Sequence, residues 1–161
     1  MERKATSPQE TMAGLRKMAL TTNPRDLGLG SDQEFPVVYG LVVDWHIGEF
    51  TATIVAMRDG SASLYTTSTF GVIGGVGHKS VRDAAQRCVM LANNYAEDTS
   101  IVTDFPYPSP GKVNFYLLTY NGVLLHTADE TQIEQGQDKH TPLFMAAQNV
   151  LTELRLVTEK R

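Results

Sequence analysis

Apolar and polar positions alternate in ways that predict three strands early in the chain. The β-branched and aromatic run from Val37 to Trp45 is typical of a strand that is buried on both faces or central in a sheet. A short turn over 46–49 leads to a returning strand, Phe50 to Met57. The dipeptide Asp59-Gly60, a strong hairpin signal, precedes a third strand over 62–69. Three strands joined by two tight turns predict an antiparallel meander.

A second hairpin is predicted in the last third of the chain. Residues 112–120 and 123–128 form apolar runs, and Asn121-Gly122 between them is the strongest short-range hairpin signal. The segment before them, Glu97 to Gly111, contains three prolines and predicts a stiff extended connector. Residues 129–140 predict a polar loop.

Helical periodicity marks three further segments. The first begins at the capping residue Ser7 and has a narrow apolar stripe, which predicts a weakly docked, peripheral helix that covers its own domain. The second begins at Lys79-Ser80, with Ser80 as N-cap, and its broad stripe suits packing across a sheet. The last begins at Thr141-Pro142, a cap followed by a proline at the first helical position.

The predicted order is therefore helix, three strands, helix, two strands, helix. This order indicates an α+β fold in which helices cover one five-stranded antiparallel sheet. We expect an N-terminal helix and linker over residues 1–35 and a single domain over residues 36–158.

The second hairpin, Phe115-Tyr116-Leu117-Leu118-Thr119-Tyr120-Asn121-Gly122-Val123, followed by a closing helix, resembles the profilin-like group that includes roadblock/LC7 and longin domains. The resemblance covers residues 36–158 by pattern. Roadblock domains place two strands before their central helix, so this chain would be a rearranged variant. The resemblance implies a dimerising or scaffolding module, often for small GTPases, that generally lacks catalytic residues.

The most specific motif is a glycine-rich turn between the third strand and the second helix. Because free N–H groups at a helix N-terminus can bind phosphate, one hypothesis is an anion or nucleotide site. Its residues would be Gly74, Gly75, Gly77, His78, Lys79 and Ser80. The spacings of the P-loop and of the Rossmann fingerprint do not fit. The sequence favours a tight connection whose glycines let the helix pack close to the sheet.

Charge and composition narrow the function classes. The net charge of −4 and the pI of about 5.5 argue against a nucleic-acid binder. No apolar run approaches the roughly 20 residues of a membrane-spanning helix. The beginning of the sequence lacks the apolar core of a signal peptide, so we expect a cytoplasmic protein with no membrane partner.

Candidate chemical groups are few. Cys88 lies on the apolar stripe of the second helix, which predicts a buried, inert thiol. The histidines show no i, i+4 pairing and no cysteine or carboxylate partner at ligand spacing; they are His46, His78, His126 and His140. We therefore predict no bound metal and no cofactor.

Asp44, in the first predicted strand, leads to a further hypothesis about function. It could serve as a metal-binding carboxylate of an RNase H-like fold, with partners among Glu49, Asp59, Asp83 and Asp104. Such folds continue with a parallel strand, whereas this sequence continues with an antiparallel hairpin. A hydrogen-bonded Asp44 near a turn is the simpler interpretation.

The sequence thus favours a non-enzymatic interaction or regulatory module of the roadblock/longin type. Its partner would be a second copy of the chain or another protein, such as the small GTPase that the resemblance implies. The alternative is a small-ligand sensor or enzyme that binds an anion or nucleotide through the turn over residues 71–80.

Overall fold

The computed structural model describes residues 8–67, 71–74, 78–98 and 100–159. Its elements follow in the order α1 (Pro8–Thr21), η1 (Pro24–Leu27), β1 (Val38–Ile47), β2 (Phe50–Met57), β3 (Ala62–Thr66), β4 (Gly71–Gly74), α2 (Lys79–Ala92), η2 (Asn93–Asp98), β5 (Ser100–Val102), β6 (Lys112–Thr119), β7 (Gly122–Asp129), α3 (Glu130–Glu134) and α4 (Thr141–Glu159).

The strands form one antiparallel sheet in the order β4-β3-β2-β1-β6-β7-β5. The predicted α+β class, the meander and the second hairpin are confirmed. The predicted number of five strands is wrong, because the described residues form a sheet of seven strands. Both additional strands lie at its edges, where a short segment needs hydrogen bonds to only one neighbouring strand. Strand β4 pairs with β3, and β5 pairs with β7.

Strand β1 lies at the centre of the sheet, between β2 and β6. Seven consecutive residues from its first position are buried, which explains why its sequence, apart from Asp44, is apolar rather than alternating. Its side chains reach both faces: Leu41 and Val43 join one hydrophobic cluster, whereas Tyr39 and Val42 join the other.

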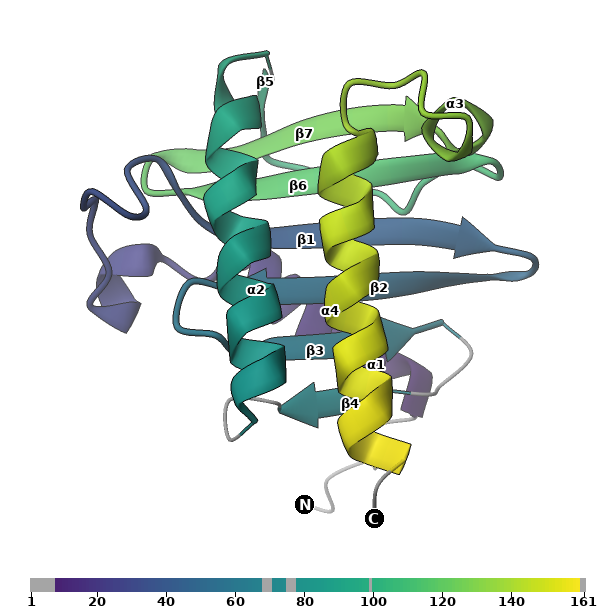
Figure 1. Ribbon diagram of the computed structural model, residues 1–161, viewed down its shortest axis with the longest axis horizontal. Coiled ribbons are helices and arrows are strands. Elements are labelled where there is room, and N and C mark those ends of the chain that lie inside the picture. The colour runs from purple at the N-terminus through teal and green to yellow at the C-terminus, as the bar shows by residue number, and fades with distance from the viewer. Residues whose placement is uncertain (1–7, 68–70, 75–77, 99, 160–161) are drawn as a thin grey trace, which may run out of the picture.

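Helices α2 and α4 lie side by side across one face of the sheet (Figure 1). The small residues on the inner side of α2 let it approach the strands closely. They are Ala84, Ala85, Cys88 and Ala92. Facing side chains from α4 and the sheet complete the larger hydrophobic cluster, which includes Phe115, Leu143 and Val150.

Helix α1 covers the opposite face. Leu20 is buried there against the smaller cluster, and Met12, Leu15 and Ala19 pack on its margin. Phe105, from the proline-rich connector, packs on the same cluster. The first helix therefore covers its own domain, as the narrow stripe predicted, but a buried ion pair described below also anchors it.

Two local predictions need correction. Helix α2 begins at Lys79 with His78 in the N-cap position, so Ser80 is inside the helix and is not its cap. The expected polar loop before α4 contains a short helix, α3. Its formation follows from Asp129, whose carboxylate accepts hydrogen bonds from the backbone N–H groups of Thr131 and Gln132.

Both hairpin glycines have the positive φ that favours glycine in tight turns: 91° at Gly60 and 137° at Gly122. Within the described segments, we find no helix with the length and apolar character that crossing a bilayer requires.

Candidate functional site

The residues of the predicted anion site fall into three groups according to where they lie. Gly74 is the last residue of β4, at the sheet edge. Gly75 and Gly77 lie outside the described residues. His78, Lys79 and Ser80 are described at the beginning of α2, where all three are exposed.

Lys79 is directed toward its own helix rather than toward an enclosed pocket. Its ammonium group lies 2.7 Å from the carboxylate of Asp83, one turn later, and its side chain is 80% exposed. The hydrogen bond from Lys79 lowers the pKa of Asp83, with attraction from Arg87 and Arg82 adding to it. The ammonium group of Lys79 is therefore paired with a carboxylate of the protein itself.

Asp44 occupies a buried polar centre between the sheet and α1. Its side chain is fully buried and lies 2.5 Å from a terminal nitrogen of Arg16, whose side chain is 8% exposed. The Thr53 hydroxyl donates a further hydrogen bond of 2.6 Å to the same carboxylate. Among the described residues, Asp44 belongs to no group of three metal-ligating side chains, so the partners that the RNase H-like hypothesis needs do not converge on it.

Arg16 links α1 to the connector as well as to the sheet. It donates a hydrogen bond of 2.8 Å to the carbonyl of Phe105, and its guanidinium lies 4.1 Å from the centre of the Tyr107 ring. Burial by itself lowers the pKa of Arg16, but the hydrogen bond and charge of Asp44 raise it overall. The arginine stays charged, and its charge is neutralised inside the fold.

Two cavities lie on either side of Arg16. One, of about 300 Å³, lies between α1 and the β2–β3 hairpin, and the other, of about 490 Å³, lies between α1 and the connector. Ala13, Arg16 and Tyr107 line both. Because Asp44 already neutralises the arginine, these cavities offer hydroxyl and aromatic contacts rather than an excess charge.

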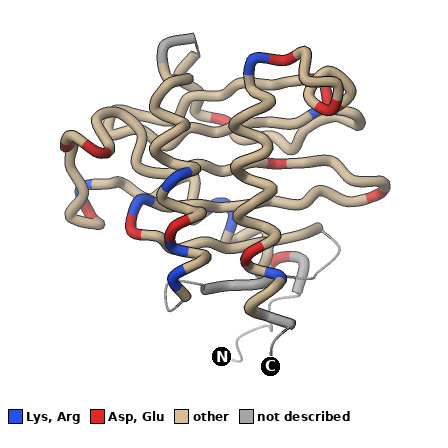
Figure 2. Tube along the Cα trace, in the orientation of Figure 1, with Lys and Arg blue, Asp and Glu red and all other residues tan. Residues whose placement is uncertain are grey.

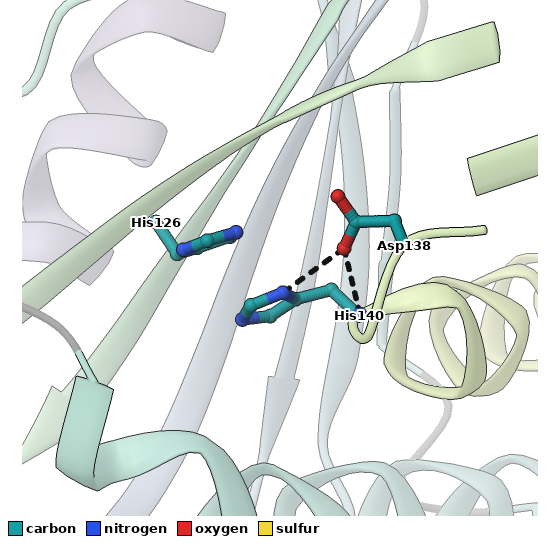
Figure 3. A group of neighbouring side chains, drawn as sticks. All are labelled: His126, Asp138 and His140. Carbon is teal, nitrogen blue, oxygen red and sulfur yellow. Dashed lines mark hydrogen bonds and ion pairs between the residues drawn. The ribbon is translucent and has the colours of Figure 1, made fainter. Parts of the chain in front are cut away.

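A second polar group contains two of the four histidines (Figure 3). His126 comes from β7, and Asp138 and His140 come from the segment between α3 and α4. One potential ligand atom from each of the three residues lies within 4.8 Å of those of the other two. The expectation for the histidines was drawn from spacing along the sequence and did not include this group, which forms in space.

Asp138 contacts both the backbone and the side-chain ring of His140. One carboxylate oxygen of Asp138 accepts a hydrogen bond of 2.7 Å from the backbone N–H of His140, and the same oxygen lies 3.1 Å from Nδ1 of the His140 ring. The ring is fully buried. It stacks on the His126 ring with 3.4 Å between ring centres and an angle of 15° between planes.

The sequence places only two of these three residues close together. Asp138 and His140 are two residues apart, a spacing at which a loop can direct both side chains to one point. His126 is 12 residues before Asp138 on a different element, and only the packing of β7 against the segment before α4 brings it to the same place.

Cys88 is buried, as the apolar stripe predicted, and burial raises the pKa of its thiol to about 12. Since the thiolate is the nucleophilic form, this cysteine is poorly suited to catalysis near neutral pH.

Comparison with known proteins adds no relative: the chain matches no protein-family model, no curated protein and no solved structure.

Proposed function

We propose that the protein is a non-enzymatic interaction module that functions as a homodimer, paired through the outer surface of α2 and α4. The arrangement of a strand meander, a central helix, a hairpin and a closing helix supports a comparison with the roadblock and longin domains of the profilin-like group. The observation that carries the proposal is an uncharged surface on this helical layer.

The uncharged surface consists of residues 88–96, which cover the end of α2 and the beginning of η2, and of residues 141–152, the first part of α4. Neither segment contains Lys, Arg, Asp or Glu. Figure 2 shows charged residues over the first two thirds of α2 and near the end of α4, and the remaining parts of both helices without charge. Because the two helices are antiparallel neighbours, their uncharged halves adjoin over β6 and β7 (Figure 1).

Two methionines are exposed at this surface. Met90 on α2 is 46% exposed and Met145 on α4 is 61% exposed. Methionine is flexible and polarizable, so it adapts to an apolar partner surface. Depletion of charge with exposed methionine is the composition found at the centre of protein interfaces.

A second copy of the chain suits this surface. In a twofold dimer the same patch meets itself, so any charge at its centre would meet a like charge. The uncharged surface avoids that penalty. The charged residues that surround it include both signs, such as Arg87 and Glu153, and these can pair at the rim.

The test is the molar mass in solution, measured by light scattering on a sizing column. The parent chain is expected at twice its 17.7 kDa. Met145→Glu places a carboxylate at the centre of the proposed interface and should give the single-chain mass. Met18→Glu is a matched control, because Met18 is also 61% exposed but lies on α1, on the opposite side of the sheet.

A parent chain that stays at the single-chain mass at high concentration would contradict the proposal. So would a Met145→Glu variant that remains dimeric. The small GTPase partner that the resemblance implies stays a prediction, and a purified dimer is the form in which to test it.

A further inference from the structure

The group of His126, Asp138 and His140 has the chemistry of a metal site. Two imidazoles and one carboxylate suit zinc and other first-row transition metals, whereas calcium and magnesium prefer oxygen ligands alone. We propose that these three residues bind one divalent transition-metal ion, with Zn²⁺ as the best match, and leave its fourth coordination position to water.

The Asp138–His140 pair already has the separation that such an ion requires. Tetrahedral zinc, with bonds of about 2.0–2.2 Å, places neighbouring ligand atoms about 3.3 Å apart. The Asp138 carboxylate oxygen and Nδ1 of His140 are 3.1 Å apart. An ion can therefore bridge these two atoms with little movement of either side chain.

The same pair is preorganised by its surroundings. The backbone N–H of His140 donates to the Asp138 carboxylate, which fixes the direction of that oxygen. The buried His140 ring packs against Tyr95 and Phe115, with ring centres 4.8 Å and 5.5 Å away. Partners that orient the ligands in this way strengthen metal binding.

His126 supplies the third ligand, and its ring must turn to do so. The two imidazoles are stacked at 15°, whereas a nitrogen lone pair lies in its ring plane, so nearly parallel rings do not direct lone pairs to one point. With ligand atoms up to 4.8 Å apart, the His126 nitrogen needs to approach by at most about 1.5 Å.

His126 lies on the accessible side of the group, because its side chain is only partly buried. Asp138 is also partly exposed, with 19% of its side chain accessible. A metal ion can therefore enter from this side, while His140 forms the buried wall.

The experiment uses the full untagged chain, stripped of metal with a chelator and dialysed. Titration with Zn²⁺, monitored by isothermal titration calorimetry, should show one ion bound per chain. Co²⁺ in place of Zn²⁺ should give the strong visible absorption of a four-coordinate site. In the ¹H–¹⁵N spectrum of the histidine rings, Zn²⁺ should shift the signals of His126 and His140 and leave those of His46 and His78 unchanged.

His126→Ala and Asp138→Asn should each weaken Zn²⁺ binding by more than the roughly 10–100-fold that loss of an outer-shell partner costs. Asp138→Asn retains an oxygen for the His140 backbone N–H, so the local turn can persist. His46→Ala, another partly buried histidine on a strand, is the matched control and should bind like the parent.

The proposal is overturned if the parent binds less than one Zn²⁺ per chain at micromolar concentrations. It is equally overturned if His126→Ala and Asp138→Asn bind like the parent, or if the ring signals that shift belong to His46 or His78. The ring signals are read on the parent chain, so this criterion does not depend on the folding of any variant.

Discussion

At the scale of single residues, the ion pair between Arg16 and Asp44 stands out because both side chains are removed from water. Isolated buried charges are unstable in a protein interior, and each of these charges is compensated by the other. The hydroxyl of Thr53 and the carbonyl of Phe105 satisfy further hydrogen-bonding positions of the pair. The pair fixes the position at which α1 docks on the sheet.

Removal of one partner should therefore be costly. We expect Asp44→Ala to lower the free energy of unfolding by about 3–5 kcal/mol, because it leaves the Arg16 charge buried without its counterion. Urea denaturation measures the change. The exposed Asp104→Ala is the control and should stay within about 0.5 kcal/mol of the parent. Equal effects of the two changes would show that the ion pair does not anchor α1.

Cys88 gives a second prediction at this scale. Because burial raises the pKa of the thiol from 9.0 to about 12, the native chain should not react with a disulfide reagent at pH 8, whereas the urea-unfolded chain should react at once. The unfolded thiol loses its proton above about pH 9 and the folded thiol does not, so stability should decrease as pH rises above 9. Rapid labelling of the native chain would contradict this burial.

At the scale of elements, the glycine of the β2–β3 turn has two roles. Gly60 supplies a positive φ, and it also lets the turn approach α2 closely. A Cβ atom built at this position would lie 2.8 Å from the Cβ and 3.0 Å from the Cα of Arg82. The turn is therefore packed closely against the Cα and the Cβ of Arg82.

Gly48, in the β1–β2 turn, separates these two roles because it has a φ of 59° and open space around it. We expect Gly48→Ala to cost about 1–2 kcal/mol, the price of a left-handed backbone for a residue with a side chain. Gly60→Ala should cost about 1–3 kcal/mol more, because Arg82 must also move. Thermal and urea unfolding of the two variants gives the comparison, and equal costs would show that the turn can shift away from α2.

The beginning of α2 gives the test of the predicted anion site. Lys79 is exposed and paired with Asp83, so we expect phosphate, sulfate and nucleotides to leave the melting temperature unchanged. A site in the glycine-rich turn would instead stabilise the chain by about 2.7 kcal/mol at a hundredfold excess over the dissociation constant. A salt of equal ionic strength is the control, and stabilisation by one anion beyond that control would favour the alternative.

At the scale of the whole molecule, stability should decrease from the centre of the sheet to its edges. Strands β1 and β6 are covered by helices on one face and by α1 with the connector on the other, whereas β5 is a three-residue edge strand with Ile101 64% exposed. We expect the amides of β1 and β6 to exchange only through global unfolding and those of β5 to exchange much faster. Hydrogen exchange followed by NMR measures both, and similar protection of β5 and β1 would contradict this order.

Most of the local structure follows from patterns among neighbouring residues. The apolar run before Trp45, the Asp59-Gly60 and Asn121-Gly122 turns and the start of α4 at Thr141 were all predictable, because turn chemistry and periodicity depend on neighbouring residues. The antiparallel order of the main strands followed from the short turns that join them.

The remaining features depend on contacts between residues that are distant in sequence. The short segments β4 and β5 are strands because β3 and β7 offer them a free edge. Arg16 and Asp44 are 28 residues apart in the sequence, so no local pattern indicates that they form an ion pair. His126 reaches Asp138 and His140 for the same reason: β7 and the segment before α4 pack together, and their packing creates a group of ligands that no local pattern contains.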